Sequence, residues 1–188
     1  MGFRQIYLHL RDQGALPPGI DDLSQCDAEG MTIAHYAVRF NIALPVDFDG
    51  WHWASNEGWT VLHEVFVNQP FSTPPEKVDW TLSDIHGWTV AHVAAQASGN
   101  LPPGFGGWSL RAFDGQTVSH VFFMSGKLFP DDFPLDAWDE KDGEGVSVIE
   151  KARSSGRSDL VAQYERAVVE ANRSQKASCG AKIARRNI

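Results

Sequence analysis

A short motif that recurs at an almost constant interval constrains the fold of this chain more than any other feature. The motif is Gly-x-Thr-(Ile/Val)-x-His, and its copies lie 28, 29 and 28 residues apart, with the glycines at Gly30, Gly58, Gly87 and Gly115. A degenerate fifth copy, residues 145–150, follows 30 residues later and reads Gly-Val-Ser-Val-Ile-Glu. A fixed period of this length is typical of repeat proteins, in which each unit packs against its neighbours.

Each copy has the chemistry of a tight turn followed by a helix. The Gly supplies a permissive backbone for the turn, and the Thr hydroxyl can cap the free amides of a helix start. Apolar residues then follow at helical spacing, as in the segment Ile33-Ala-His-Tyr-Ala-Val38. The helices are predicted to end near Asn41, Asn68, Gly99 and Gly126, because a Pro follows each of them and cannot continue a helix.

A second motif, Leu-Pro-x-x-Phe-x-x-Trp, lies between the copies of the first. It occurs at residues 44–51 and 101–108, with a looser version at 129–138. Its apolar residues are three or four apart, which predicts a short, partly helical return that packs on one side. We interpret the periodic tryptophans of these segments as structural: Trp51, Trp80, Trp108 and Trp138.

The segments 27–37 and 84–94, Asp-x-x-Gly-x-Thr-x-x-His-x-Ala, resemble the opening half of an ankyrin repeat. That family uses Gly-x-Thr-Pro-Leu-His, a β-turn and two antiparallel helices in a unit of about 33 residues. Here Ile or Val replaces the Pro, the unit is shorter, and the second motif replaces the usual second helix. The resemblance covers roughly residues 27–156 and implies an all-α, ankyrin-like α-solenoid of short helix-turn-helix repeats with a C-terminal capping helix.

Domain boundaries follow from where the repeats begin and end. We expect an N-terminal capping half-repeat over residues 1–26 and four to five ankyrin-like repeats over 27–157. A C-terminal capping helix is expected over 158–172, followed by a flexible basic tail over 173–188. Stacking of at least three units is needed before such an array has a continuous core.

The repeated Thr and His residues could serve the fold or a reaction. Equivalent positions in stacked helical layers lie about 10 Å apart, whereas zinc holds its ligands at about 2 Å. The ankyrin resemblance implies instead that each His bonds the Thr of its own turn. We therefore assign a structural role to the repeated set: Thr32, His35, Thr60, His63, Thr89, His92, Thr117 and His120.

Other signs of catalysis or of a cofactor are weak. Cys26 and Cys179 form neither a disulfide framework nor a zinc motif, and the carboxylates of residues 131–144 lack the pattern of a calcium loop. No nucleophile elbow or phosphate-binding loop is present. The sequence predicts no catalytic residue, no metal and no cofactor, and hence no enzyme.

Two tryptophans occupy the variable place between Gly and Thr, where the other copies have Met or Gln. A place that accepts such different residues is not dictated by the core, and Trp is enriched at binding hot spots. We expect an aromatic and acidic partner-binding surface at the turns, formed by Trp59, Trp88, His86, Glu57, Asp84 and Asp114. The alternative is that each Trp packs against its neighbour's turn.

Charge and hydropathy point to a protein partner. The chain has a net charge of −8, yet residues 171–188 hold five basic and no acidic side chains. The remaining acidic body disfavours nucleic acid and favours a basic partner. We found no secretory signal and no apolar run long enough for a membrane span, and we expect a cytoplasmic location.

The function expected from these patterns is a non-enzymatic protein–protein interaction module. It would act as an inhibitor or adaptor that occupies a partner's surface through its turns and concave face. Two alternatives stay open at this point. One is a metal- or His-dependent enzyme built on the repeated histidines, and the other is a structural subunit that self-associates into a homo-oligomer.

Overall fold

Every copy of the first motif leads directly into a short α-helix in the computed structural model of the chain. The structure describes residues 1–68, 77–97 and 101–184, with residues 175–184 described by their backbone alone. The helices that follow the motif are α2 (Ile33–Arg39), α3 (Val61–Asn68), α4 (Val90–Ala97), α5 (Val118–Met124) and α7 (Val148–Ser154). Each begins at the residue after the Thr or Ser of its motif.

The remaining elements are helical too. They are α1 (Phe3–Gln13), the 3-10 helix η1 (Gly50–His52), α6 (Leu135–Asp139) and α8 (Ser158–Ala184). Across the described ranges the protein has eight α-helices and no β-strand beyond isolated bridges, so it is an all-α protein. None of the helices in these ranges combines the length and apolar character needed to cross a bilayer.

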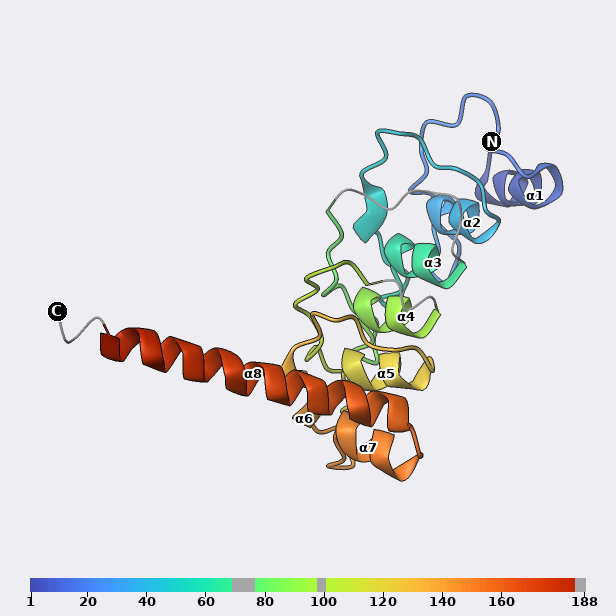
Figure 1. Cartoon of the computed structure of the whole chain (residues 1–188). Helices are drawn as coiled ribbons and strands as arrows, with labels where there is room; N and C mark the ends of the chain where they lie inside the picture. The colour runs from blue at the N-terminus through green and yellow to red at the C-terminus, as the bar shows by residue number, and fades with distance from the viewer. Residues whose placement is uncertain (69–76, 98–100, 185–188) are drawn as a thin grey trace.

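The motif helices lie side by side in one row (Figure 1). The row runs from α2 through α3, α4 and α5 to α7, with α1 at one end and α6 and α8 at the other. Each helix packs on the next through small or branched side chains that are fully buried, such as Ala34, Ala37, Ala91 and Ala94. Helices of seven or eight residues are too short to be stable alone, so this packing holds them.

The prediction of two helices in each repeat is wrong for most of the second halves. The segment between α2 and α3 contains only η1, and the described residues 101–117 contain no helix. The Pro of the second motif forms a single turn instead, in which the Pro carbonyl accepts a hydrogen bond from the amide of the Phe three residues later. This turn recurs at Pro45–Phe48, Pro102–Phe105 and Pro130–Phe133, at 3.0–3.1 Å.

The second halves pack through aromatic rings that contact one another from layer to layer. Trp80 meets Phe105 with ring centroids 5.6 Å apart, and Trp108 meets Phe133 at 4.7 Å. Trp138 continues the series to Tyr164 of α8 at 5.7 Å. Trp108 and Trp138 are buried, which confirms their interpretation as structural residues. Ring packing therefore replaces a second helix in stabilising the stack.

Both ends of the row are covered by helices. Ile6 and Leu10 of α1 are buried against α2, and Leu160 of α8 is buried against the other end. The helix α8 does not stop at residue 172, where the sequence predicted a change to a flexible tail, but continues to Ala184 and projects away from the row (Figure 1). Residues 185–188 of that predicted tail lie outside the described residues.

Candidate functional site

The turns before the motif helices form a connected series, which we call the turn row: residues 27–31, 55–59, 84–88, 112–116 and 142–146. In the second, third and fourth turns, the amide of one tip residue donates to a carbonyl of the preceding turn at 2.8–2.9 Å. The pairs are Asn56 to Glu29, Ile85 to Glu57 and Phe113 to His86. Because these bonds use backbone groups alone, the side chains at the tips are free to vary without loss of the row.

A glycine is required in each of the first four turns because the next turn comes very close. Gly115 has φ 86°, and a Cβ added to it would lie 2.4 Å from Cα of Gly143 in the following turn. A Cβ on Gly87, which has φ 75°, would lie 2.9 Å from the amide nitrogen of Phe113. Both the left-handed backbone and the close contact exclude a side chain.

Each of the four histidines bridges two layers. Its Nδ1 lies 2.6–2.8 Å from the Thr hydroxyl of its own turn. Its Nε2 faces a backbone carbonyl of the next turn at 3.0–3.3 Å, and the carbonyls belong to Trp59, Trp88, Gln116 and Val146. Since a carbonyl can only accept, the proton sits on Nε2 and Nδ1 accepts.

Burial keeps these rings neutral. His35, His63, His92 and His120 are at most 1% exposed, and removal from water lowers the pKa of each ring below its ordinary value. Protonation would place a hydrogen on Nδ1, which already accepts from the Thr amide in the first three turns at 3.0–3.1 Å. Both ring nitrogens are thus used within the stack. Within the part of the chain that the structure describes, no three His, Cys, Asp or Glu residues are grouped to hold a metal ion.

The two turn tryptophans are half-buried rather than fully exposed. The indole of Trp59 stacks on His63 with ring centroids 4.7 Å apart, and its Nε1–H donates to Glu64 Oε1 at 3.0 Å. Trp88 lies against the core of the C-terminal half and near His92, at 5.6 Å between centroids. Each Trp therefore packs on its own layer while keeping part of its surface accessible.

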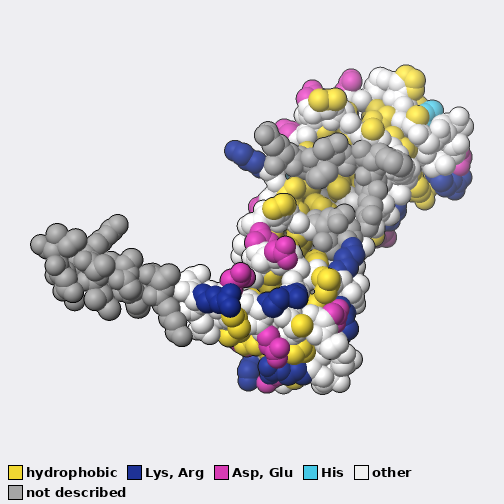
Figure 2. Space-filling model, in the orientation of Figure 1, with side chains coloured by type: hydrophobic (Ala, Val, Ile, Leu, Met, Phe, Trp, Pro, Cys, Tyr) yellow, Lys and Arg dark blue, Asp and Glu magenta, His cyan; other side chains and the backbone are white. Residues whose placement is uncertain are grey.

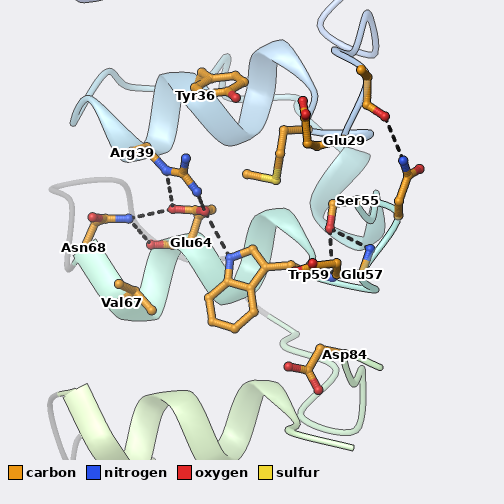
Figure 3. Close-up of a pocket in the computed structure, with 13 residues that line it drawn as sticks. Glu29, Tyr36, Arg39, Ser55, Glu57, Trp59, Glu64, Val67, Asn68 and Asp84 are labelled. Atoms are coloured by element: carbon orange, nitrogen blue, oxygen red, sulfur yellow. Dashed lines mark hydrogen bonds and ion pairs between the residues drawn. The ribbon is translucent and has the colours of Figure 1, made fainter. Parts of the chain in front are cut away.

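Trp59 also lines a cavity of about 760 Å³ between the first layers of the row (Figure 3). Above the indole in this view lie Tyr36 and Arg39 of α2, and Glu64 of α3 joins Arg39 to the Trp59 ring. Glu57 and Asp84, from the second and third turns, line the same cavity. The structure thus brings together three of the six residues that the sequence assigned to partner binding.

The other three assigned residues lie elsewhere on the turn row. His86 and Asp114 are exposed at the tips of the third and fourth turns, while Trp88 is half-buried between them. Asp84 and Asp114 also have a local role, because each accepts a hydrogen bond from a backbone amide of its own turn at 2.8–2.9 Å. These carboxylates therefore stabilise the shape of the turn and also give it negative charge.

Sequence reasoning missed the two apolar side chains that protrude most from the turn row. Ile85 is 54% exposed and Phe113 is 81% exposed, in neighbouring turns. The equivalent tip position is Ala28, Asn56 and Gly143 in the other turns, so neither side chain is required by the stack. Their signal was available in the alignment of the repeats, as bulky apolar residues at a place that otherwise holds small or polar ones.

The second tip position is acidic in most turns. It holds Glu29, Glu57, Asp114 and Glu144, with His86 in the third turn. All five side chains are exposed. By contrast, several Lys and Arg side chains gather over α7 and α8 on the face seen in Figure 2. The turn row is therefore a largely negative surface with two apolar side chains near its middle.

Comparisons with known proteins add no assignment to this geometry. No protein-family model matches the chain, and no curated protein matches its sequence.

Proposed function

We propose that this protein is an ankyrin-like α-solenoid that binds another protein through its turn row. The observation that carries the proposal is the exposure of Ile85 and Phe113, at 54% and 81%, on turns whose backbone is tied from layer to layer. Large exposed apolar side chains on a rigid framework are typical of interaction surfaces. A binding role requires no catalytic residue, and the protein is proposed to act as an inhibitor or adaptor.

The ankyrin-like assignment is supported by features of the single repeat. Each of the first four units has a β-bridge that ends at its Thr, a hydrogen bond between Thr and His, and a helix that starts at the next residue, and Ser147 and Glu150 take the places of Thr and His in the fifth unit. The side-by-side helices α2 to α5 and α7 repeat this arrangement along the row (Figure 1). Repeat arrays of this kind present variable turns on an invariant framework, which suits a binding scaffold.

The partner is proposed to present a basic surface. The turn row carries exposed carboxylates on four of its five turns, so it attracts positive charge and repels nucleic acid phosphates. Long-range attraction of this kind raises the association rate, whereas the central apolar side chains contribute to affinity. We expect the partner to be a protein of the cytoplasm.

Affinity capture with matched surface variants tests the proposal. Ile85→Ser/Phe113→Ser removes the apolar tips, while Val46→Ser/Leu128→Ser removes two exposed apolar side chains outside the turn row. We expect one host protein at stoichiometric ratio with the wild type and the control variant, and its loss with the turn variant. Circular dichroism checks that both variants fold. Equal capture by both variants, or no capture by the wild type, would contradict the proposal.

A further inference from the structure

The cavity beside Trp59 has the size and walls of a site for a side chain supplied from outside. Its volume of about 760 Å³ is within the usual range for ligand sites. The indole on its wall is held in place, because its Nε1–H bonds Glu64 and its ring stacks on His63. The cavity therefore offers a fixed aromatic surface that needs no rearrangement before binding.

One end of the cavity already holds a cation of the chain itself. The guanidinium of Arg39 lies 5.4 Å from the centre of the Tyr36 ring and pairs with Glu64, whose side chain is 3% exposed. Glu64 also accepts from Asn68 Nδ2 at 2.8 Å. Since Glu64 is fully engaged by these partners and by Trp59, this end is complete and leaves no place for a second cation.

The other end has the same kinds of groups but lacks the cation. Trp59 supplies the aromatic surface of the cavity, and Glu29, Glu57 and Asp84 supply carboxylates from three successive turns on the side of the turn tips (Figure 3). Within the described ranges, no side chain forms an ion pair with Glu29 or Glu57. Four carboxylates against one guanidinium give the lining a negative charge that excludes an anionic ligand.

We infer that this cavity takes an arginine or lysine side chain from the partner protein, held against Trp59 and between the Glu29 and Glu57 carboxylates. This inference rests on the proposed function and names the chemistry that the partner must present. A cation beside an aromatic ring gains attraction from the ring's quadrupole, and exposed carboxylates add ion pairing. Arg39, between Tyr36 and Glu64, is the chain's own example of the arrangement.

Binding of a defined basic peptide tests the inference. The probe is a fluorescein-labelled peptide of alternating arginine and serine, and its binding is measured by fluorescence anisotropy at about 0.15 M salt. At this ionic strength, interactions between exposed charges are screened beyond about 8 Å. The matched probe replaces arginine with citrulline, which keeps the shape and removes the charge. We expect the arginine peptide to bind the wild type and the citrulline peptide to bind much more weakly.

Variants then locate the site. Glu29→Gln/Glu57→Gln removes two exposed carboxylates of the cavity, and we expect the peptide affinity to fall roughly three- to tenfold. Asp131→Asn/Asp139→Asn removes the same charge from exposed positions outside both the cavity and the turn row, and it should change affinity by less than about twofold. Trp59→Phe keeps a ring but weakens the cation attraction, so a fall of roughly twofold is expected.

Three results would overturn the inference. Equal losses in the two double variants would mean that the acidic body attracts the peptide without a site. Equal binding of the citrulline peptide would exclude a cation as the occupant. A change of oligomeric state in Glu29→Gln/Glu57→Gln would identify a second copy of this chain as the occupant. If host-protein capture still depends on Ile85 and Phe113 in these cases, the proposed function stands and only the cavity assignment fails.

Discussion

At the scale of single residues, the motif His joins its own turn to the next layer. Because Nε2 donates to a carbonyl of the following turn, every layer needs a successor to satisfy its His. The last copy of the motif has Glu150 in place of His, and this Glu accepts from the Ser147 amide at 2.8 Å. That capping box is local, so the final layer is satisfied without a further turn.

Acid is expected to destabilise the fold through the four buried histidines. Their pKa is lowered in the folded state, whereas an unfolded His titrates near about 6.5. The unfolded chain therefore binds more protons below about pH 6.5, and the free energy of unfolding falls there by up to about 1.4 kcal/mol per pH unit for each His. Urea unfolding at about pH 7.5 and about pH 5.5 measures the difference.

A single substitution of a buried ring isolates its share of the pH dependence. His120→Gln should make the dependence of unfolding free energy on pH shallower between about pH 5 and 6.5, because one proton-binding difference is lost. His86→Gln, at an exposed turn tip, is the matched control for the loss of one imidazole. A pH-independent stability across this range would show that the rings do not carry the effect.

Removal of one bridging His ring should lower the free energy of unfolding, because the ring joins two layers. His92→Ala leaves the Thr89 amide and the Gln116 carbonyl without their partner and opens a cavity, so a loss of about 2–4 kcal/mol is expected. His52→Ala, at an exposed position, should change stability by less than about 0.5 kcal/mol. Chemical denaturation gives both values. Stoichiometric metal in the wild type that is lost in His92→Ala would contradict a purely structural role.

At the scale of elements, each repeat has a tight turn followed by one short helix, and among the described returns the one between α5 and α7 adds a second short helix, α6. The turn is set by side-chain and backbone bonds within a few residues, so the same geometry forms in every copy. Asp27, Asp84 and Asp142 each accept from two amides of their own turn, and Ser55 takes the same place in the second turn. The returns depend instead on ring contacts between layers.

A pair of glycine substitutions separates backbone strain from the contact between layers. Gly115 and Gly145 occupy the same place in consecutive turns, with φ of 86° and 77°. A Cβ on Gly115 would meet Gly143 at 2.4 Å, whereas a Cβ on Gly145 would have no atom within 4 Å. Gly145→Ala should therefore lower the free energy of unfolding only by the backbone strain, about 1–2 kcal/mol. Gly115→Ala should lower it by about 1–3 kcal/mol more, because its Cβ also collides with the next turn.

Thermal or urea unfolding of the two glycine variants provides the comparison, with the wild type measured beside them. The difference between Gly115→Ala and Gly145→Ala isolates the close approach of neighbouring turns. If the two substitutions cost the same, the turns can separate freely and the turn row is not rigid.

At the scale of the whole molecule, the row has two differently covered ends and a projecting helix. The N-terminal layers share one buried cluster and the C-terminal layers share another, and the buried aromatic side chains of the two clusters all belong to the second. The helix α8 contributes Leu160, Val161 and Tyr164 to this second cluster. Its continuation to Ala184 leaves the row, as Figure 1 shows.

The two parts of α8 are expected to differ sharply in their effect on stability. Leu160→Ala removes a side chain with 0% exposure from the covered end and should cost about 2–5 kcal/mol. A chain that stops after Asn172 should unfold within about 0.5 kcal/mol of the full chain, since Arg173 and Ser174 are already exposed. Urea unfolding checks both. A large loss on truncation would show that the projecting part of α8 packs on the row.

The sequence by itself determined the spacing of the repeats, the start of the helix in each copy of the motif and the position of each turn. These follow from contacts within a few residues, such as Thr to His and Asp to amide, which a repeated pattern displays directly. Only the tertiary structure decided which turn side chains protrude. Trp59 packs on His63 and donates to Glu64, whereas the Phe113 ring lies beside Gly87 of the preceding turn and stays exposed. Exposure depends on packing between layers, and that packing brings together residues from separate repeats.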